Sequence, residues 1–254
     1  MLLQHFEASQ PPNQPTVNTE CQSDVACGRK AFQNIFWFLT KSGVLPVAAP
    51  WSGHPEKNFD RVWIEDFFRE YAMTHTKPGS RCLEWGIHYT EEFFGQVCQI
   101  RDALEYGGPR SPVTHATGTT FYGDVHSLPE EMSNTFDILI ITQVHEHLWN
   151  PMKANKELFR ILKPGGLVYV TAPHISVFHG VPDDFYRYTV NGLKSIFMDA
   201  GFECLLARPY GNLGTTVATI MGFDVDSYTT SEKHYAPAED GLYSEVMGIF
   251  KKPL

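Results

Sequence analysis

The chain has 254 residues, of which 43% are hydrophobic, and its formal net charge is -9. This length allows one large domain with a substantial core. The acidic balance and the lack of a Lys and Arg cluster exclude a nucleic-acid partner, because phosphates are bound mainly by such side chains. The sequence shows neither an apolar run of roughly 18 residues nor a secretory signal pattern, so we expect a cytoplasmic protein without a membrane partner.

Cysteine usage is sparse and irregular. The five cysteines are an odd number, and none of them forms a C-x-x-C pair. This pattern indicates neither a disulfide framework nor a zinc site and predicts reduced thiols. The positions are Cys21, Cys27, Cys82, Cys98 and Cys204.

The N-terminal third precedes the main alternating pattern. Residues 1–27 are rich in Pro, Gln, Asn, Thr and Ser, which predicts a flexible arm. Residues 28–78 contain two amphipathic segments and predict a helical cover over the main domain, 79–254. The second segment, at about 60–75, has Asp60 as a candidate N-cap. We interpret these helices as a packing cover rather than a lid.

From residue 81 onward, strand-like and helix-like segments alternate. The strand-like segments are continuously apolar, which is typical of a mostly parallel sheet with helices on both faces. We predict strands at "RCLEWG", "TTFYGDV", "FDILIITQ", "LVYVTAP", "FECLLARPY" and "SEVMGIFKK", and helices at "TEEFFGQVCQIRDALEYGG", "NPMKANKELFRILKPGG" and "TVNGLKSIFMDAG".

The second strand of such a sheet has two possible positions. The segment between Gly107 and Thr120 is rich in Gly and Pro and has little apolar content. The strand is either short, at about Val113–His115, or earlier, at Val97–Arg101. In the second case the predicted helix that begins at Thr90 is shorter than its spacing indicates.

Polar residues follow four of the predicted strands. Parallel sheets bind ligands at the carboxyl ends of their strands, where the strand order reverses. The candidate segments are therefore "EWGIH" from residue 84, "GDVH" from 123, "QVHEH" from 143 and "PH" from 173.

The ordered series "LEWGIHY", "FYGDVHSLP", "FDILIITQVHEHLWNPMKANKELFRILKPGGLVYVTAP" and "DDFYRYTVNGLKSIFMDAGF" resembles the motifs of class I S-adenosylmethionine-dependent methyltransferases. The resemblance is to the small-molecule, methyltransferase type 11-like kind and covers about residues 80–208. It implies a Rossmann-like α/β fold, doubly wound, with a mostly parallel seven-stranded sheet and an antiparallel last strand. It also implies S-adenosyl-L-methionine as cofactor and methyl transfer to an O- or N-nucleophile of a small-molecule acceptor.

The resemblance assigns cofactor contacts to the strand ends. Glu84 is expected to support the amino-acid portion of the cofactor, and Gly86 to let the backbone approach it closely. Asp124 is expected to accept a hydrogen bond from the adenine amino group, with Val125 beside the ring. Gln143 falls near the methionine end.

The glycine loop departs from the family pattern. Where the family repeats glycine at alternate positions, this chain has His88 and Thr90. His88 is therefore a candidate contact for the cofactor carboxylate. The departure also supports an alternative, a catalytically silent member of the fold that acts as a binding or partner subunit. Asp102 and Glu105 are the acids near the expected ribose position, but both fall in the predicted helix, and neither is assigned.

Three histidines after predicted strands are candidates for a catalytic base: His145, His147 and His174. Each of them can equally be a structural residue that orients a loop. Some quinone-pathway O-methyltransferases carry a Glu-x-x-Glu-His metal pattern, which here corresponds to Gln143, Glu146 and His147. The missing first carboxylate weakens a site for a hard cation, so we expect no metal.

Two loops are candidates for the acceptor side. In "FHGVPDDFYRYT", Asp184 or Thr189 is expected to cap the next helix, and Arg187 either meets a polar acceptor or pairs with a neighbouring Asp. The insertion at about 210–240 is longer than a simple connection requires. A dinucleotide-dependent oxidoreductase fits poorly, because G-x-G-x-x-G is absent.

Overall fold

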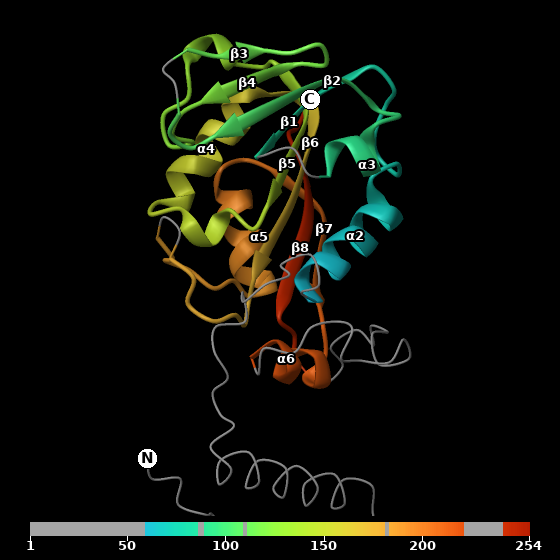
Figure 1. Cartoon of the computed structure of the whole chain (residues 1–254), viewed down its shortest axis with the longest axis vertical. Coiled ribbons are helices and arrows are strands. Elements are labelled where there is room, and N and C mark those ends of the chain that lie inside the picture. The colour runs from blue at the N-terminus through green and yellow to red at the C-terminus, as the bar shows by residue number, and fades with distance from the viewer. Residues whose placement is uncertain (1–58, 86–88, 109–110, 181–182, 221–240) are drawn as a thin grey trace, which may run out of the picture. The chain divides into compact units, whose positions relative to one another are not determined.

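The computed structural model describes residues 59–85, 89–108, 111–180, 183–220 and 241–254. These residues form a sheet with helices on both faces (Figure 1). The helices are α2 (Phe59–Tyr71), α3 (Thr90–Phe94), α4 (Pro151–Ile161), α5 (Val190–Asp199) and α6 (Leu213–Ile220), with 3-10 turns η2 (Glu130–Met132) and η3 (His145–His147). The strands are β1 (Ser80–Trp85), β2 (Cys98–Glu105), β3 (Val113–Thr114), β4 (Thr119–Tyr122), β5 (Phe136–Thr142), β6 (Leu162–Pro173), β7 (Glu203–Tyr210) and β8 (Glu245–Lys251).

The sheet has eight strands in the order β3-β4-β2-β1-β5-β6-β8-β7. Strands β4, β2, β1, β5 and β6 pair in parallel, whereas β8 is antiparallel to both of its neighbours. The doubly wound α/β fold with an antiparallel last strand is therefore confirmed. One more strand is present than predicted, because β3 adds an antiparallel pair at the edge next to β4. The strand order reverses between β1 and β5.

The helix predicted from Thr90 to Gly108 is wrong beyond Phe94. The chain leaves α3 at Gly95 and enters β2, which hydrogen-bonds to β1 on one side and β4 on the other. Apolar residues in this segment fall at helical spacing, but pairing between two strands of a sheet outweighs that local pattern. Both positions considered for the second strand are extended, since β2 overlaps the earlier one and β3 the later one.

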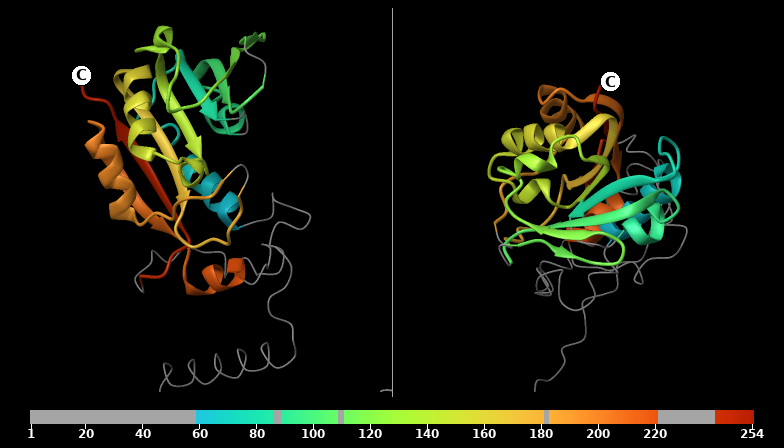
Figure 2. Two further views of the ribbon diagram at one scale, coloured as in Figure 1. Left: turned by 90° about the vertical axis from the view of Figure 1, so that its left-hand side faces the viewer. Right: turned by 90° about the horizontal axis from the view of Figure 1, so that it is seen from above.

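Two apolar layers enclose the sheet. Helices α2 and α3 lie on one face, and α4 and α5 lie on the other (Figure 2). On the α2 face, Phe67 and Phe68 are almost completely buried and contact the ring of Tyr169 edge-on. Helix α2 begins at Phe59, so Asp60 lies in its first turn rather than at its N-cap. The predicted arm at 1–27 and the first amphipathic segment lie outside the described residues.

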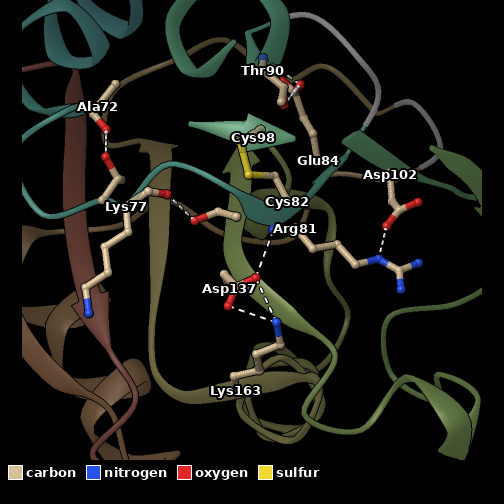
Figure 3. Close-up of a disulfide and its surroundings, with 12 residues drawn as sticks. Ala72, Lys77, Arg81, Cys82, Glu84, Thr90, Cys98, Asp102, Asp137 and Lys163 are labelled. Carbon is tan, nitrogen blue, oxygen red and sulfur yellow. Dashed lines mark hydrogen bonds and ion pairs between the residues drawn. A yellow bond between two sulfur atoms is a disulfide. The ribbon is translucent and has the colours of Figure 1, made fainter. Parts of the chain in front are cut away.

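A disulfide joins β1 to β2, which corrects the prediction of reduced thiols. Cys82 and Cys98 are buried, and their Cα atoms lie 5.6 Å apart (Figure 3). The strand pairing brings them together across 16 residues of sequence. The odd number and irregular spacing of the cysteines gave no indication of this pair, because it depends on how β1 and β2 lie in the sheet. Cys204 is a free, half-buried thiol.

Of the two residues considered for the cap of α5, Thr189 takes that position. Thr189 caps α5, because its side chain accepts a hydrogen bond from the N–H of Gly192 at 3.0 Å. Among the described helices, none has the length and apolar character required to cross a membrane.

Candidate functional site

A cavity of about 360 Å³ lies at the carboxyl ends of β1, β2, β4 and β5. This is the point where the strand order reverses, which is where open parallel sheets bind ligands. Its walls combine aromatic and polar side chains from segments far apart in the sequence. They include Trp85, Tyr106, Asp124, Gln143, His147 and Phe185.

A second cavity, of about 540 Å³, lies at the opposite end of the sheet. Its walls include Lys77, Asp137 and Gly165, which lie at or near the amino ends of β1, β5 and β6. Ligand sites of this fold class form at the other edge. We therefore place the candidate site in the cavity at the carboxyl ends.

Glu84 organises the start of the loop that follows β1. It is 1% exposed, and its carboxylate accepts hydrogen bonds from the N–H groups of Tyr89 (3.0 Å) and Thr90 (2.9 Å) and from the Thr90 hydroxyl (2.5 Å; Figure 3). The loop is thus tied back to the end of β1 by a buried charge. Gly86 and His88, predicted to contact the cofactor, lie outside the described residues.

Asp124 and Val125 line the cavity side by side. One oxygen of Asp124, Oδ1, accepts from the N–H of His126 at 2.9 Å and contacts the Nδ1 atom of that residue at 2.5 Å. Partial burial favours a higher pKa for Asp124, but these bonds from His126 outweigh it and hold the pKa below its ordinary value. The ring of His126 packs against Trp149, a cavity residue that the sequence analysis missed.

Gln143 follows β5 directly with a φ of 53°, a conformation that non-glycine residues adopt rarely. Its side-chain amide donates to Thr171 Oγ1 at 3.2 Å and to Glu245 Oε2 at 2.9 Å. These bonds hold the residue in its uncommon conformation beside the cavity. Backbone strain of this kind concentrates at functional sites.

One buried acid, Glu245, and one partly buried acid, Asp60, lie behind this wall. Burial, together with the nearby charge of Asp60, raises the pKa of Glu245 well above its ordinary value. Burial also raises the pKa of Asp60, although the neighbouring Arg61 opposes the effect. Arg61 lines the cavity and donates to the Tyr89 hydroxyl at 3.2 Å, so α2 contributes to the site as well as covering the sheet. The sequence offered no signal for Arg61 or Glu245, since both depend on how distant segments pack.

The three histidines predicted as catalytic have different environments. Of these, His147 alone lines the cavity. His145 has no exposed surface; its Nε2 lies 2.8 Å from Asn155 Oδ1, and burial lowers its pKa. His174 stacks on Tyr243, and its Nδ1 lies 2.9 Å from the carbonyl oxygen of Tyr188. The cavity thus brings His147 together with Asp124, Val125 and Gln143, and it does not include His145 or His174.

Asp102 and Glu105, the two acids near the expected ribose position, lie in different environments. Asp102 lies within β2, where it pairs with Arg81 at 2.6 Å and accepts from the N–H of Thr119 at 2.7 Å. Glu105 is the exposed last residue of β2, directly before the cavity residue Tyr106. Glu105 therefore occupies the strand end next to β1. The sequence analysis left it unassigned because this segment was predicted as helix.

Comparisons with known proteins agree with this geometry. A family model described as "Methyltransferase domain" matches residues 103–170. Among curated relatives, a "Probable S-adenosylmethionine-dependent methyltransferase" of Mycolicibacterium smegmatis is 27% identical over 178 residues, which cover 63% of this chain and 67% of the relative. A second protein with that description, from Mycobacterium tuberculosis, is 24% identical over 168 residues, and the match covers 58% of each chain.

The fold matches solved structures of the same kind. A crystal structure of an S-adenosylmethionine-dependent methyltransferase from Mesorhizobium loti aligns with a TM-score of 0.52 at 12% identity, over 77% of this chain and 100% of that one. Identity this low supports the fold alone. In its matched domain, its curated relatives and its strand order, the chain is similar to the class I S-adenosylmethionine-dependent methyltransferases.

Proposed function

We propose that this protein transfers the methyl group of S-adenosylmethionine to an O- or N-nucleophile of a small-molecule acceptor. The observation that carries the proposal is the cavity at the β1/β5 switch point, which gathers the ends of β1, β2, β4 and β5. Its volume and mixed aromatic and polar walls suit a small organic ligand.

The cofactor contacts follow from the order of the strand ends around the cavity. Asp124 accepts from the adenine amino group through Oδ2, the oxygen to which no described residue donates, and Val125 packs beside the ring. Glu105, at the end of the neighbouring strand, accepts from the ribose hydroxyls. Gln143, after β5, lies at the methionine end. Glu84 supports the site indirectly, because its carboxylate accepts hydrogen bonds from the N–H groups of Tyr89 and Thr90 and so holds the loop after β1 in place.

Methyl transfer depends mainly on alignment of the acceptor atom with the methyl group. Methyl transfer from a sulfonium is an in-line displacement, and correct positioning alone can supply about 7–11 kcal/mol. A base is needed only where the acceptor atom carries a proton to be removed. Of the three histidines considered, we retain His147 for contact with the acceptor, because it lines the cavity and its Nδ1 is anchored to the Asp183 carbonyl oxygen at 2.5 Å. We assign His145 and His174 to the structure of the loops.

Two measurements test this function. The first is calorimetric titration with S-adenosylhomocysteine, which should give saturable one-to-one binding; no binding would refute cofactor use. The second supplies methyl-labelled S-adenosylmethionine together with a size-fractionated cell extract. Label in the low-mass fraction supports a small-molecule acceptor, whereas label confined to protein or nucleic acid contradicts it.

A further inference from the structure

Beside the cavity, three side chains from two loops converge on one point. Glu146 and His147 belong to η3, after β5, and His179 comes from the loop between β6 and α5. One potential ligand atom of each lies within 4.8 Å of the other two. Oε1 of Glu146 is 3.6 Å from Nε2 of His147 and 3.7 Å from Nε2 of His179.

Glu146 is buried without the hydrogen bonds that its charge requires. Its side chain has no exposed surface, and neither carboxylate oxygen has a hydrogen-bond partner within the described part of the chain. Direct N–H···O bonds span about 2.7–3.2 Å, so the two imidazoles are too distant to supply them. A buried charge of this kind is normally paired or bound to a metal.

Both imidazoles present the same nitrogen to Glu146. Nδ1 of His147 lies 2.5 Å from the carbonyl oxygen of Asp183, and Nδ1 of His179 lies 3.0 Å from that of Val177. A carbonyl oxygen only accepts, so Nδ1 carries the hydrogen in each ring. Nε2 is then the nitrogen of each ring that faces Glu146, at 3.6 Å for His147 and 3.7 Å for His179. Histidine ligands of metal ions are typically held by such a bond from their other nitrogen.

The loop that carries His179 is braced in this position. Asp184 accepts from the N–H of His179 at 2.9 Å and is itself paired with both terminal nitrogens of Arg187. Arg187 therefore acts as scaffold for His179, the second of the two roles considered for it from sequence.

The spacing fits a small divalent ion. Tetrahedral zinc with bonds of about 2.0–2.1 Å sets its ligand atoms about 3.3–3.4 Å apart. The separations of Glu146 Oε1 from the two Nε2 atoms, 3.6 and 3.7 Å, are close to that value, and all three ligand atoms lie within 4.8 Å of one another. Two imidazole nitrogens with one carboxylate oxygen form a donor set that suits zinc and other first-row transition ions, whereas magnesium prefers oxygen ligands.

We propose that Glu146, His147 and His179 bind one divalent first-row transition ion of the zinc class. This departs from the sequence-based expectation of no metal. It also differs from the Glu-x-x-Glu-His pattern, because Gln143 is bonded to Thr171 and Glu245 instead, and the third ligand comes from the next loop.

The ion site adjoins the cavity, since His147 belongs to both. An open coordination position there suits an acceptor oxygen or nitrogen, and a bound cation makes an acceptor hydroxyl easier to deprotonate. His147 then serves as a ligand and not as a base. The role of the ion in activating the acceptor rests on the proposed function, whereas binding of the ion itself does not.

The site is tested on the full-length protein after removal of metal with a chelator. Titration with Co²⁺ should produce visible absorption bands at one equivalent, Zn²⁺ should displace them, and Mg²⁺ should not. His179→Gln should weaken Co²⁺ binding by about 100-fold or more, because even outer-shell partners are worth about 10–100-fold. His75→Gln, which alters an exposed histidine remote from the cluster, should bind as the unmodified protein does.

Two results would overturn the site. One is the absence of saturable Co²⁺ or Zn²⁺ binding in folded protein, with NMR showing protonated His179 paired to Glu146 instead. The other is equal Co²⁺ affinity in His179→Gln and the unmodified protein. Glu146→Gln, checked for folding by circular dichroism, provides a second ligand variant. A protein that binds Co²⁺ but not S-adenosylhomocysteine contradicts only the proposed function, and the opposite result contradicts only the ion site.

Discussion

The adenine contact proposed for Asp124 can be tested by changing a single atom. Asp124→Asn retains Oδ1, which accepts from the N–H of His126, and replaces Oδ2 by an amide that can only donate. The side chain is 46% exposed, and ion pairs in such positions contribute about 0–1 kcal/mol to stability. The variant should therefore remain folded while it loses its acceptor for the adenine amino group.

The expected loss of affinity for S-adenosylhomocysteine follows from the charge on the Asp124 carboxylate, which accepts the hydrogen bond. A hydrogen bond to a charged group contributes about 1.5–3 kcal/mol, which corresponds to about 10- to 150-fold in the dissociation constant. Isothermal titration with S-adenosylhomocysteine measures it directly. S-inosylhomocysteine carries an acceptor where adenine carries its amino group, so Asp124→Asn should bind this analogue better than the unmodified protein does.

Asp199→Asn is the matched control, because Asp199 is exposed at the end of α5, outside the cavity. It should leave both affinities unchanged. If Asp124→Asn bound S-adenosylhomocysteine within about twofold of the unmodified protein, or if the preference for the inosyl analogue did not change, the adenine role would be refuted.

Three further predictions concern stability. Glu84→Leu leaves the buried N–H groups of Tyr89 and Thr90 without an acceptor and should lower the free energy of unfolding, followed by urea titration, by about 2–6 kcal/mol. The control Glu91→Gln changes a side chain that is 82% exposed and should alter this free energy by less than about 0.5 kcal/mol. Reduction of the Cys82–Cys98 disulfide, which closes a short loop, should cost about 3 kcal/mol, and a Cys82→Ala/Cys98→Ala variant should be insensitive to reductant. Because the pKa of Glu245 is raised in the folded protein, the folded state binds more protons than the unfolded state between the ordinary carboxyl pKa and the raised pKa. The free energy of unfolding should therefore fall as pH rises through this range, by at most about 1.4 kcal/mol per pH unit. Glu245→Gln should remove that decline, and an unchanged pH profile in this variant would contradict the assignment.

Most of the sheet was predictable because its strands are short apolar runs between strong breaks. Strand β5 is a continuous buried run, and β6 begins directly after α4, with Pro164-Gly165-Gly166 among its first residues and a buried apolar run after them. Strand β2 was not predictable in the same way. Its apolar residues satisfy a helical period, and only the hydrogen bonds to β1 and β4 decide its conformation.

The candidate site, like the sheet, could be predicted only in part. The rule that ligands bind at the carboxyl ends of parallel strands brought Asp124, Val125 and Gln143 to one edge of the sheet, and all three line one cavity; their contact with a cofactor stays a prediction. It could not separate His147 from His145, two residues away. The η3 turn directs one ring to the cavity and the other into the core, because residues two apart in a 3-10 helix point in different directions.

The order of elements, their apolar faces and the polar strand ends are local properties, so the amino-acid sequence determined them by itself. Three pairs were decided only by tertiary structure: Cys82 with Cys98 between two strands, and Glu146 with His179 and Gln143 with Glu245 at or beside the cavity, the last of which are 102 residues apart. Each contact depends on where the sheet sets two distant segments. No local pattern encodes such a distance, because the energy of burying both faces of the sheet, summed over the whole domain, selects the arrangement.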